Sequence, residues 1–352
     1  MGKKLLEVKD LSVSFNTYAG EVQALRGINF SVDRGETLAI VGESGSGKSV
    51  TVQTIMGLIP MPPGEIKNGE IFFDGEDLIK ASPERMRELR GGKIGMIFQD
   101  PMTSLNPTIK VGKQIMEGIL IHKKVTKEEA RQKAVEMLRK VGIPKPEERF
   151  EQYPHEFSGG MRQRAVIAIA LSCEPDLLIC DEPTTALDVT IQAQILDLIN
   201  ELKRELNIAV ILITHDLGVV AETADRVVVM YAGEKLEEAP VRELFKNPKH
   251  PYTWGLLKSL PRLDMKIGEK LASIPGTPPD LLKPPVGDPF AARSEYAMKI
   301  DYERKPPMID LGNGHLVKSW LYVDGAPKVK SPFEQKDSFK SNNRKKEGNN
   351  VN

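Results

Sequence analysis

Short apolar runs alternate with amphipathic segments along the chain after residue 35. This alternation is typical of an α/β fold built around a mainly parallel sheet. Three earlier segments, residues 6–15, 24–32 and 69–73, are separated by turn-forming residues and are expected to pair as antiparallel strands in a separate small sheet. The later runs that we predict as core strands are residues 37–41, 94–99, 177–180, 209–214 and 226–230.

A helical pattern occupies residues 101–171, between the second and third of these core strands. Thr126 and Glu129 have the spacing of a capping box, which marks the start of a helix. Apolar residues then recur at helical spacing from Ala130 to Val141. We therefore expect a helical subdomain inserted into the sheet domain.

The C-terminal quarter differs in amino-acid composition from the rest of the chain. Proline and glycine become dense within residues 273–289, which predicts a small irregular module at residues 263–330, appended to a large domain at residues 1–262. Residues 331–352 are rich in Lys, Asn and Ser and nearly free of apolar side chains, so burial cannot offset the entropy of ordering them. We expect this tail to be disordered.

Composition narrows the class of protein. The 352 residues are 40% hydrophobic and 28% charged, and no apolar run approaches the roughly 18–20 residues that cross a bilayer. Because 49 basic residues balance 49 acidic ones, net charge gives no electrostatic reason to expect a nucleic-acid partner. Two cysteines, Cys173 and Cys180, lie in or beside apolar runs and are expected to be buried thiols in a reducing cytoplasm.

The sequence GESGSGKS follows the first predicted core strand and precedes a run, residues 50–58, that we expect to be helical. A glycine-rich turn between a strand and a helix lets successive N–H groups wrap phosphate, while Lys48 adds charge and the Ser49 hydroxyl can ligate Mg²⁺. By itself this loop does not separate kinases, GTPases and motor ATPases. The residues expected to contact the nucleotide here are Gly42, Ser44, Gly45, Ser46, Gly47, Lys48, Ser49 and Val50.

Two adjacent carboxylates end the predicted strand at residues 177–180. Asp181 is placed to hold a metal ion, and Glu182 can polarise an attacking water at the edge of the sheet where α/β proteins bind ligands. Their presence in a chain that also carries a phosphate loop favours a catalytic pair over an ordinary acidic turn.

A second anion-binding segment is predicted at FSGGMRQR, residues 157–164. Ser158 can cap the helix that follows, while Gly159 and Gly160 leave its first N–H groups exposed. Such a segment alone is most often a cap and turn. Its position just before the acidic strand favours a second phosphate-binding surface.

Taken together, these motifs resemble the nucleotide-binding subunits of ATP-binding cassette (ABC) transporters, over nearly the whole chain through about residue 325. Residues 42–49 are similar to the Walker A loop, residues 177–181 to the Walker B strand, and Glu182 to the catalytic glutamate. Gln99 is similar to the Q-loop glutamine, which contacts Mg²⁺ and the attacking water. The predicted Mg²⁺ ligands are thus Ser49, Gln99 and Asp181.

The resemblance assigns four further features. Ser158, Gly159, Gly160 and Met161 are similar to the signature loop, although Phe157 and Met161 stand where Leu and Gln are commonest. Asp188 resembles the D-loop residue and His215 the switch histidine, which joins Glu182 and Gln99 in the predicted catalytic set. An aromatic side chain stacks on adenine in this family, and either Phe15 or Tyr18 can serve, with Tyr18 favoured.

The resemblance also implies partners. Family members close two cassettes head to tail, so that each ATP lies between one chain's glycine loop and the other's Ser-Gly-Gly, and the second cassette here is expected to be non-identical. The helical insertion around residues 101–114 is expected to dock beneath two transmembrane permease subunits at the cytoplasmic face of the membrane. An extracytoplasmic solute-binding protein is then an indirect partner.

Several segments are similar to the peptide-importer branch, above all NPKHPYTWGLLKSLPRLD at residues 247–264. In that branch the C-terminal module usually carries four cysteines that hold an iron–sulfur cluster, but the equivalent positions here are Asp288, Ser294, Asp301 and Ser319. Without thiolates such a cluster has no ligands, so none is expected. We interpret the four residues as solvated surface rather than a cation site, and expect the module to pack around Phe290, Tyr296, Met298 and Trp320.

The leading hypothesis is therefore the ATP-hydrolysing subunit of an importer for dipeptides or oligopeptides. An oligosaccharide importer of the same branch is an alternative, because the ATPase does not touch the substrate. A soluble ABC ATPase of translation or DNA repair is an alternative of another class, although two cassettes or a long coiled coil would be expected there. A small-molecule kinase leaves Ser158, Gly159, Gly160 and His215 unexplained.

Overall fold

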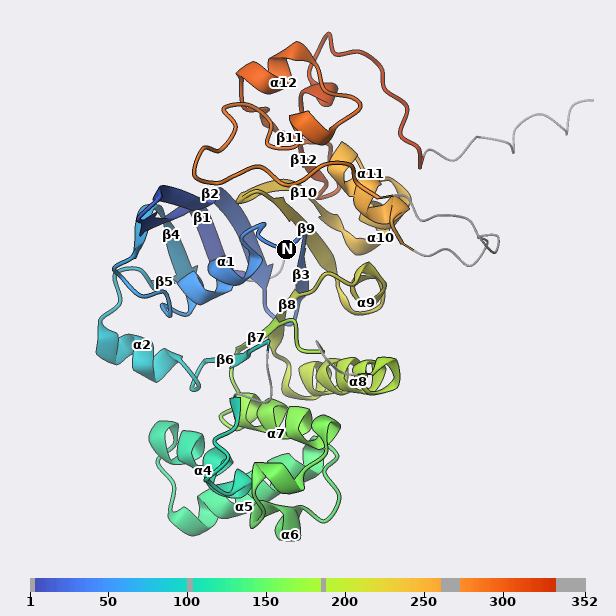
Figure 1. The fold of residues 1–352 in the computed structure, drawn as a ribbon. Helices are drawn as coiled ribbons and strands as arrows, with labels where there is room; N and C mark the ends of the chain where they lie inside the picture. The colour runs from blue at the N-terminus through green and yellow to red at the C-terminus, as the bar shows by residue number, and fades with distance from the viewer. Residues whose placement is uncertain (1–3, 100–103, 185–187, 261–272, 334–352) are drawn as a thin grey trace, which may run out of the picture.

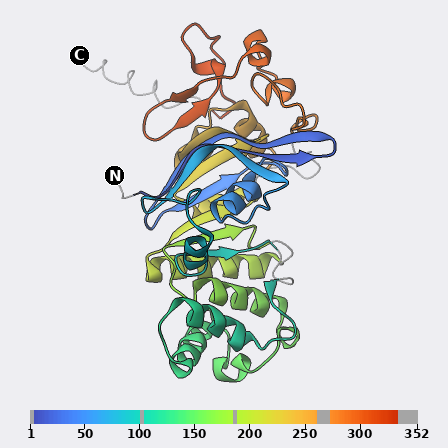
Figure 2. The ribbon, with the colours of Figure 1, turned by 90° about the vertical axis from the view of Figure 1, so that its left-hand side faces the viewer.

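The computed structural model describes residues 4–99, 104–184, 188–260 and 273–333, which form two sheets with helices between and around them (Figures 1 and 2). A four-stranded antiparallel sheet has the order β2-β1-β4-β5, and an eight-stranded sheet has the order β11-β12-β10-β9-β3-β8-β7-β6. The pairs within β9-β3-β8-β7-β6 are parallel. Both the mainly parallel core and the separate small sheet are confirmed.

All eight predicted runs are strands, with shifted ends, whereas the strands at residues 76–77, 234–240, 308–310 and 316–318 were not predicted. The antiparallel strands are longer than expected, and the core strand near residue 94 ends two residues sooner. The strands are β1 Lys4–Thr17, β2 Gly20–Asp33, β3 Thr37–Val41, β4 Gly64–Phe73, β5 Glu76–Asp77, β6 Ile94–Ile97, β7 Leu177–Asp181, β8 Ala209–Ile213, β9 Arg226–Tyr231, β10 Glu234–Pro240, β11 Met308–Asp310 and β12 Leu316–Lys318.

The helices confirm the insertion between β6 and β7. Thr126 and Glu129 form the expected capping box at the start of α5. The α-helices are α1 Lys48–Ile55, α2 Pro83–Leu89, α4 Val111–His122, α5 Lys127–Lys140, α6 Pro146–Phe150, α7 Gly159–Leu171, α8 Val189–Leu206, α9 Leu217–Thr223, α10 Val241–Lys246, α11 Pro251–Lys258 and α12 Lys299–Glu303. The 3₁₀ turns are η1 Pro154–Glu156, η2 Ala291–Arg293 and η3 Trp320–Tyr322.

The central strands β7 and β8 are buried on both faces, as expected for parallel strands. On β7, Leu177 and Ile179 face the core that α1 shares with the antiparallel sheet, while Leu178 and Cys180 face the core of the inserted helices. This two-residue alternation holds α1 and the helical insertion on opposite faces of one sheet. Cys173 and Cys180 are buried free thiols, as predicted.

The C-terminal module is continuous with the main sheet, because its β11–β12 hairpin pairs with β10. The predicted boundary at residue 262 falls outside the described residues, as do most of the predicted tail at 331–352 and the first residues of the insertion. Of the four aromatic and sulfur side chains expected to pack the module, Phe290 is buried. Tyr296, Met298 and Trp320 are partly buried, and the ring of Tyr296 packs edge-on against Trp254 at a centroid distance of 5.1 Å.

Candidate functional site

The glycines of the loop between β3 and α1 are required by its geometry. A Cβ on Gly42 would lie 2.1 Å from the carbonyl oxygen of Met230, and one on Gly47 would lie 2.7 Å from Leu25 Cδ2. Gly45 has a φ of +77°, which favours glycine, and a Cβ there would meet nothing within 4 Å. Two glycines therefore allow close packing, and the third leaves open space beside the backbone.

The Lys48 ammonium is folded back onto the loop. Its Nζ donates to the carbonyl oxygens of Gly42 and Glu43, at 2.8 and 3.0 Å. Burial lowers the pKa of Lys48, and nearby carboxylates, Glu182 foremost, oppose this shift. The Ser46 hydroxyl is buried without a hydrogen-bond partner among the described residues, and α1 starts without a side-chain cap. These donors are the kind that a phosphate group satisfies.

The proposed metal ligands lie beside this loop. Ser49 Oγ donates to Asp181 Oδ1 across 3.0 Å, and Asp181 is 5% exposed at the end of β7. Burial raises the pKa of Asp181, while the hydrogen bond from Ser49 acts in the opposite direction. A buried carboxylate with a hydroxyl beside it is a donor set of hard oxygens, which fits Mg²⁺.

The three predicted catalytic side chains meet at the ends of neighbouring strands. Gln99, two residues after β6, donates from Nε2 to Glu182 Oε2 across 2.9 Å. His215, two residues after β8, has Nδ1 3.5 Å from Glu182 Oε1. Because β6, β7 and β8 are parallel neighbours, their carboxyl ends place these groups at one edge of the sheet.

The predicted signature loop caps α7 as expected. Ser158 Oγ accepts a hydrogen bond of 3.3 Å from the N–H of Met161, and Gly159 is exposed with open space beside its Cα. A Cβ on Gly160 would lie 3.2 Å from Ile191 in α8, the helix that Asp188 caps. Figures 1 and 2 place α7 among the inserted helices and α1 beside the antiparallel sheet, so the two glycine-rich helix starts lie in different parts of the molecule.

The two candidate adenine partners differ in exposure. Tyr18 lies at the turn between β1 and β2 and is fully exposed. Phe15 pairs across the sheet with Gly64 and packs against the core. Tyr18 is thus free to stack on a base, whereas Phe15 is held within the sheet.

Some residues around the site were not predicted. Gln163 in α7 is fully buried, and its Nε2 donates to the carbonyl oxygen of Pro183, the residue after Glu182. Its sequence signal was a glutamine at an inward-facing helical position. Arg293 of the C-terminal module reaches Glu43 of the glycine loop, and no local pattern indicated that contact.

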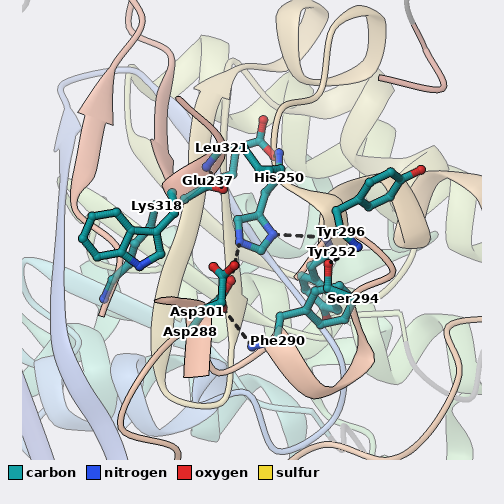
Figure 3. A network of polar contacts seen from close by, with 12 residues as sticks. Glu237, His250, Tyr252, Asp288, Phe290, Ser294, Tyr296, Asp301, Lys318 and Leu321 are labelled. Atoms are coloured by element: carbon teal, nitrogen blue, oxygen red, sulfur yellow. Dashed lines mark hydrogen bonds and ion pairs between the residues drawn. The ribbon is translucent and has the colours of Figure 1, made fainter. Parts of the chain in front are cut away.

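The positions equivalent to cluster-binding cysteines form a set of capped turns (Figure 3). Asp288, Asp301 and Ser319 are 6%, 5% and 3% exposed, so their interpretation as solvated surface is wrong. Each accepts a backbone N–H two or three residues away: Asp288 from Phe290 at 2.9 Å, Asp301 from Met298 at 2.6 Å, Ser319 from Leu321 at 3.2 Å, and Ser294 likewise from Tyr296 at 3.2 Å.

This donor set does not fit an iron–sulfur cluster, which is held chiefly by thiolates. The carboxylates and hydroxyls are already engaged in local turns. Among the described residues, no group of three or more His, Cys, Asp or Glu side chains is arranged to hold a metal ion. The absence of a cluster stays a prediction.

A family profile described as "ABC transporter" matches residues 25–185. Among solved structures, an ATP-binding cassette captured as a dimer in a post-hydrolysis state, bound to ADP and Pi, is 27% identical with a TM-score of 0.60, covering 67% of this chain and 99% of that one. The fold and the site define an ABC-type ATPase, which binds and hydrolyses ATP.

The relatives narrow the class further. The oligopeptide transport ATP-binding protein OppD of Bacillus subtilis is 64% identical over 94% of this chain and 92% of its own length. The dipeptide transport ATP-binding protein DppD of Lactococcus lactis is 55% identical over 93% of each chain. A profile for the C-terminal region of oligopeptide/dipeptide transporters matches residues 236–300. The chain belongs to this family, the ATPase subunits that power ABC importers of oligopeptides and dipeptides.

In the described part of the chain, no helix combines the length and the apolarity needed to cross a bilayer.

Proposed function

We propose that this chain hydrolyses ATP in a pocket shared with a second cassette, and that this cycle drives peptide import. The observation that carries the proposal is the meeting of Gln99, Glu182 and His215 at three adjacent strand ends. On this chain's side, the glycine loop up to Val50 binds the phosphates and Tyr18 stacks on adenine. Mg²⁺, held by Ser49, Asp181 and Gln99, supplies charge neutralisation on the phosphate oxygens when bound.

The chemistry assigned to this chain is general base catalysis. Glu182 accepts a proton from water as the water oxygen attacks the γ-phosphorus, and the bond to the ADP oxygen breaks. The amide of Gln99 donates to one oxygen of the Glu182 carboxylate, and His215 Nδ1 lies 3.5 Å from the other, so the carboxylate has neighbours on both oxygens before ATP arrives. On nucleotide binding, Lys48 exchanges its two carbonyl acceptors for phosphate oxygens.

The second anion-binding segment requires a second chain. Among the described residues, the N–H groups of Gly159 and Gly160 at the start of α7 have no hydrogen-bond acceptor, and this helix start belongs to a different part of the molecule from α1. A related cassette was solved as a dimer with ADP and Pi. ATP then shifts the population toward the closed head-to-tail pair, because it binds the closed pair better than the open one. Loss of the γ-phosphate releases the Ser158 loop of the partner chain.

The remaining assignments follow from the family. The partner cassette is non-identical, and the pair docks through the insertion around residues 101–114 on two permease subunits at the cytoplasmic face of the membrane. Within that segment, Ile109 is an exposed apolar side chain, although residues 101–103 lie outside the described part. An extracytoplasmic solute-binding protein selects the cargo. The named peptide specificity of the relatives favours peptides over oligosaccharides.

The composite pocket is tested by comparing Ser158→Arg with Lys48→Ala. We expect Lys48→Ala to abolish ATP binding by the isolated chain. Ser158→Arg should leave that binding unchanged and lower turnover only in the assembled transporter, because it obstructs the partner's site. If Ser158→Arg weakens binding by the isolated chain as much as Lys48→Ala does, the shared pocket is wrong.

A further inference from the structure

The C-terminal module contacts the glycine loop directly through one arginine. Arg293, in η2, is an almost fully buried side chain. Its Nη1 donates to Glu43 Oε2 at 2.6 Å and its Nη2 donates to Glu43 Oε1 at 3.1 Å. Glu43 is the second residue of GESGSGKS. A bidentate guanidinium–carboxylate pair of this kind has a fixed orientation as well as strength.

The guanidinium is held on its other sides by the module and the core sheet. Nε donates to the carbonyl oxygen of Pro275 at 2.7 Å, Nη2 to that of Ile274 at 3.3 Å, and Nη1 to the Tyr231 hydroxyl at 3.0 Å. The group is therefore anchored before it meets Glu43. A shift of the backbone at residues 274–275 or at Arg293 would therefore move the guanidinium, and the guanidinium would move Glu43 with it.

Glu43 itself connects this anchor to the phosphate-binding groups. Its N–H donates to the Tyr252 hydroxyl at 2.8 Å, and its carbonyl oxygen accepts from Lys48 Nζ at 3.0 Å. The carbonyl also accepts the N–H of Ser46 at 3.2 Å. Any displacement of Glu43 thus moves two groups that face the phosphates.

The module also touches the hairpin that carries Tyr18. The carbonyl oxygen of Leu281 accepts the N–H of Gln23 at 3.0 Å, and Leu282 lies 3.5 Å from the position of a Cβ on Gly20. The same module therefore contacts both the phosphate side and the proposed base side of the nucleotide site. A purely structural ion pair would have no reason to end on this loop.

We propose that Arg293 is a positioning residue for ATP binding, through which the C-terminal module sets the conformation of the glycine loop. This rests on the loop being the ATP site, as proposed above. Because both partners are largely buried, removing one leaves the other charge without its counter-ion, and the loop is expected to move to relieve it. The effect should fall on affinity for ATP rather than on the hydrolysis step.

The test uses the full chain assembled with its partner cassette and permease subunits. We expect Arg293→Gln and Glu43→Gln each to raise the KM for ATP about tenfold with kcat within about twofold. The double variant should be no worse than either single one, because the two residues act as one unit. Arg293→Lys, which keeps the charge but loses the fork, should give an intermediate KM.

Two control variants separate positioning from general loosening. Arg85→Gln removes a bidentate pair with Glu76, remote from the loop and with similar geometry. Arg26→Gln removes a module anchor, the 2.8 Å bond to the carbonyl oxygen of Pro285, together with the ion pair to the buried Glu234, while the side chain of Arg26 has no hydrogen bond to the loop among the described residues. Both should leave the KM for ATP within about twofold of the original chain.

The outcomes are distinct. If Arg293→Gln fails to fold, Glu43→Gln carries the test, because it changes only the loop side of the pair. An unchanged KM in Glu43→Gln, additive effects in the double variant, or an equal rise in Arg26→Gln would each overturn the proposal. Lys48→Ala distinguishes failure of the proposed ATP site from failure of the positioning role. If Lys48→Ala still binds ATP, the assigned ATP site is wrong. If Lys48→Ala loses ATP binding while Glu43→Gln has a normal KM, only the positioning role of Arg293 is wrong.

Discussion

The side chain of Gln163 in the signature helix α7 donates a hydrogen bond to the carbonyl oxygen of Pro183, which directly follows Glu182. This bond connects the helix that begins at the Ser158 loop, which we propose to face the partner chain, with the strand end that carries the proposed base. Glu182 has a φ of +49°, an unusual backbone conformation for a residue with a side chain. A fixed neighbour on its C-terminal side therefore matters for its orientation.

Gln163→Leu tests this connection. The Oε1 atom of Gln163 is buried without a partner among the described residues, so leucine removes one unpaired acceptor while it frees another at Pro183. We expect the free energy of unfolding to change by less than about 1 kcal/mol, while kcat falls about tenfold because the base is misplaced. Urea denaturation and steady-state turnover measure the two quantities. Gln132→Leu, on the exposed face of α5, is the control, and a normal kcat in Gln163→Leu would contradict the connection.

Glu182→Gln should separate binding from chemistry. The amide keeps the size of the side chain but cannot accept the proton of the attacking water, so we expect turnover to fall by about 10²–10⁴-fold. ATP binding should persist, and the closed pair of cassettes should accumulate because the γ-phosphate is not removed. Size-exclusion chromatography with ATP measures the closed pair. Turnover that matches the original chain would show that another group is the base.

Tyr18→Ala tests the assignment of the adenine partner. Because Tyr18 is fully exposed, its removal should not change the free energy of unfolding, but loss of stacking should weaken ATP binding about tenfold. Tyr18→Phe should bind normally. Phe15→Ala should instead lower stability, because Phe15 packs against the core. Equal ATP affinity in Tyr18→Ala and the original chain would show that another residue stacks on adenine.

The proposed catalytic constellation was predictable because each of its members follows an apolar run within one or two residues. Gln99, Glu182 and His215 come after three core strands, and parallel strands that are buried on both faces are the easiest elements to recognise in a sequence. Their carboxyl ends then coincide by the geometry of the sheet alone. The contact of Arg293 with Glu43, in contrast, joins residues 250 positions apart and leaves no periodic signal.

Strand β10 was missed for a related reason. Its sequence, EKLEEAP, carries three glutamates, which argues against burial. Glu234 is nonetheless fully buried, because Arg26 at 3.2 Å and Lys318 at 2.6 Å pair with it. Burial opposes its ionisation, but these cations hold the pKa of Glu234 below its ordinary value. Glu237, also fully buried, lies with Oε1 2.7 Å from His315 Nε2, within hydrogen-bond distance. The partners come from β2 and the distant module, so local sequence could not reveal the strand.

The module should make stability depend on pH through Asp288. Burial raises the pKa of this carboxyl to about 7, against about 3.9 in an unfolded chain. Between these values the folded chain binds more protons than the unfolded one, so the stabilising effect is fully present below about pH 4 and is lost as the pH rises through about 7. His250, whose Nε2 lies 3.9 Å from Asp288 Oδ2, has its pKa lowered by burial to about 3 and stays neutral across this window (Figure 3).

Asp288→Asn should remove this dependence, because the amide stays uncharged and can still accept the N–H of Phe290. We expect the variant to be more stable than the original chain at pH 8, by about 1 kcal/mol or more, and close to it at about pH 4, where the folded carboxyl is protonated and the unfolded one begins to be. Urea denaturation at both pH values measures the difference. Burial also raises the pKa of Asp301, so both chains keep part of the pH dependence. The quantity to compare is therefore the difference in free energy of unfolding between the variant and the original chain at each pH. A variant that is less stable than the original chain at pH 8 would show that Asp288 is stabilised as an anion in the folded module.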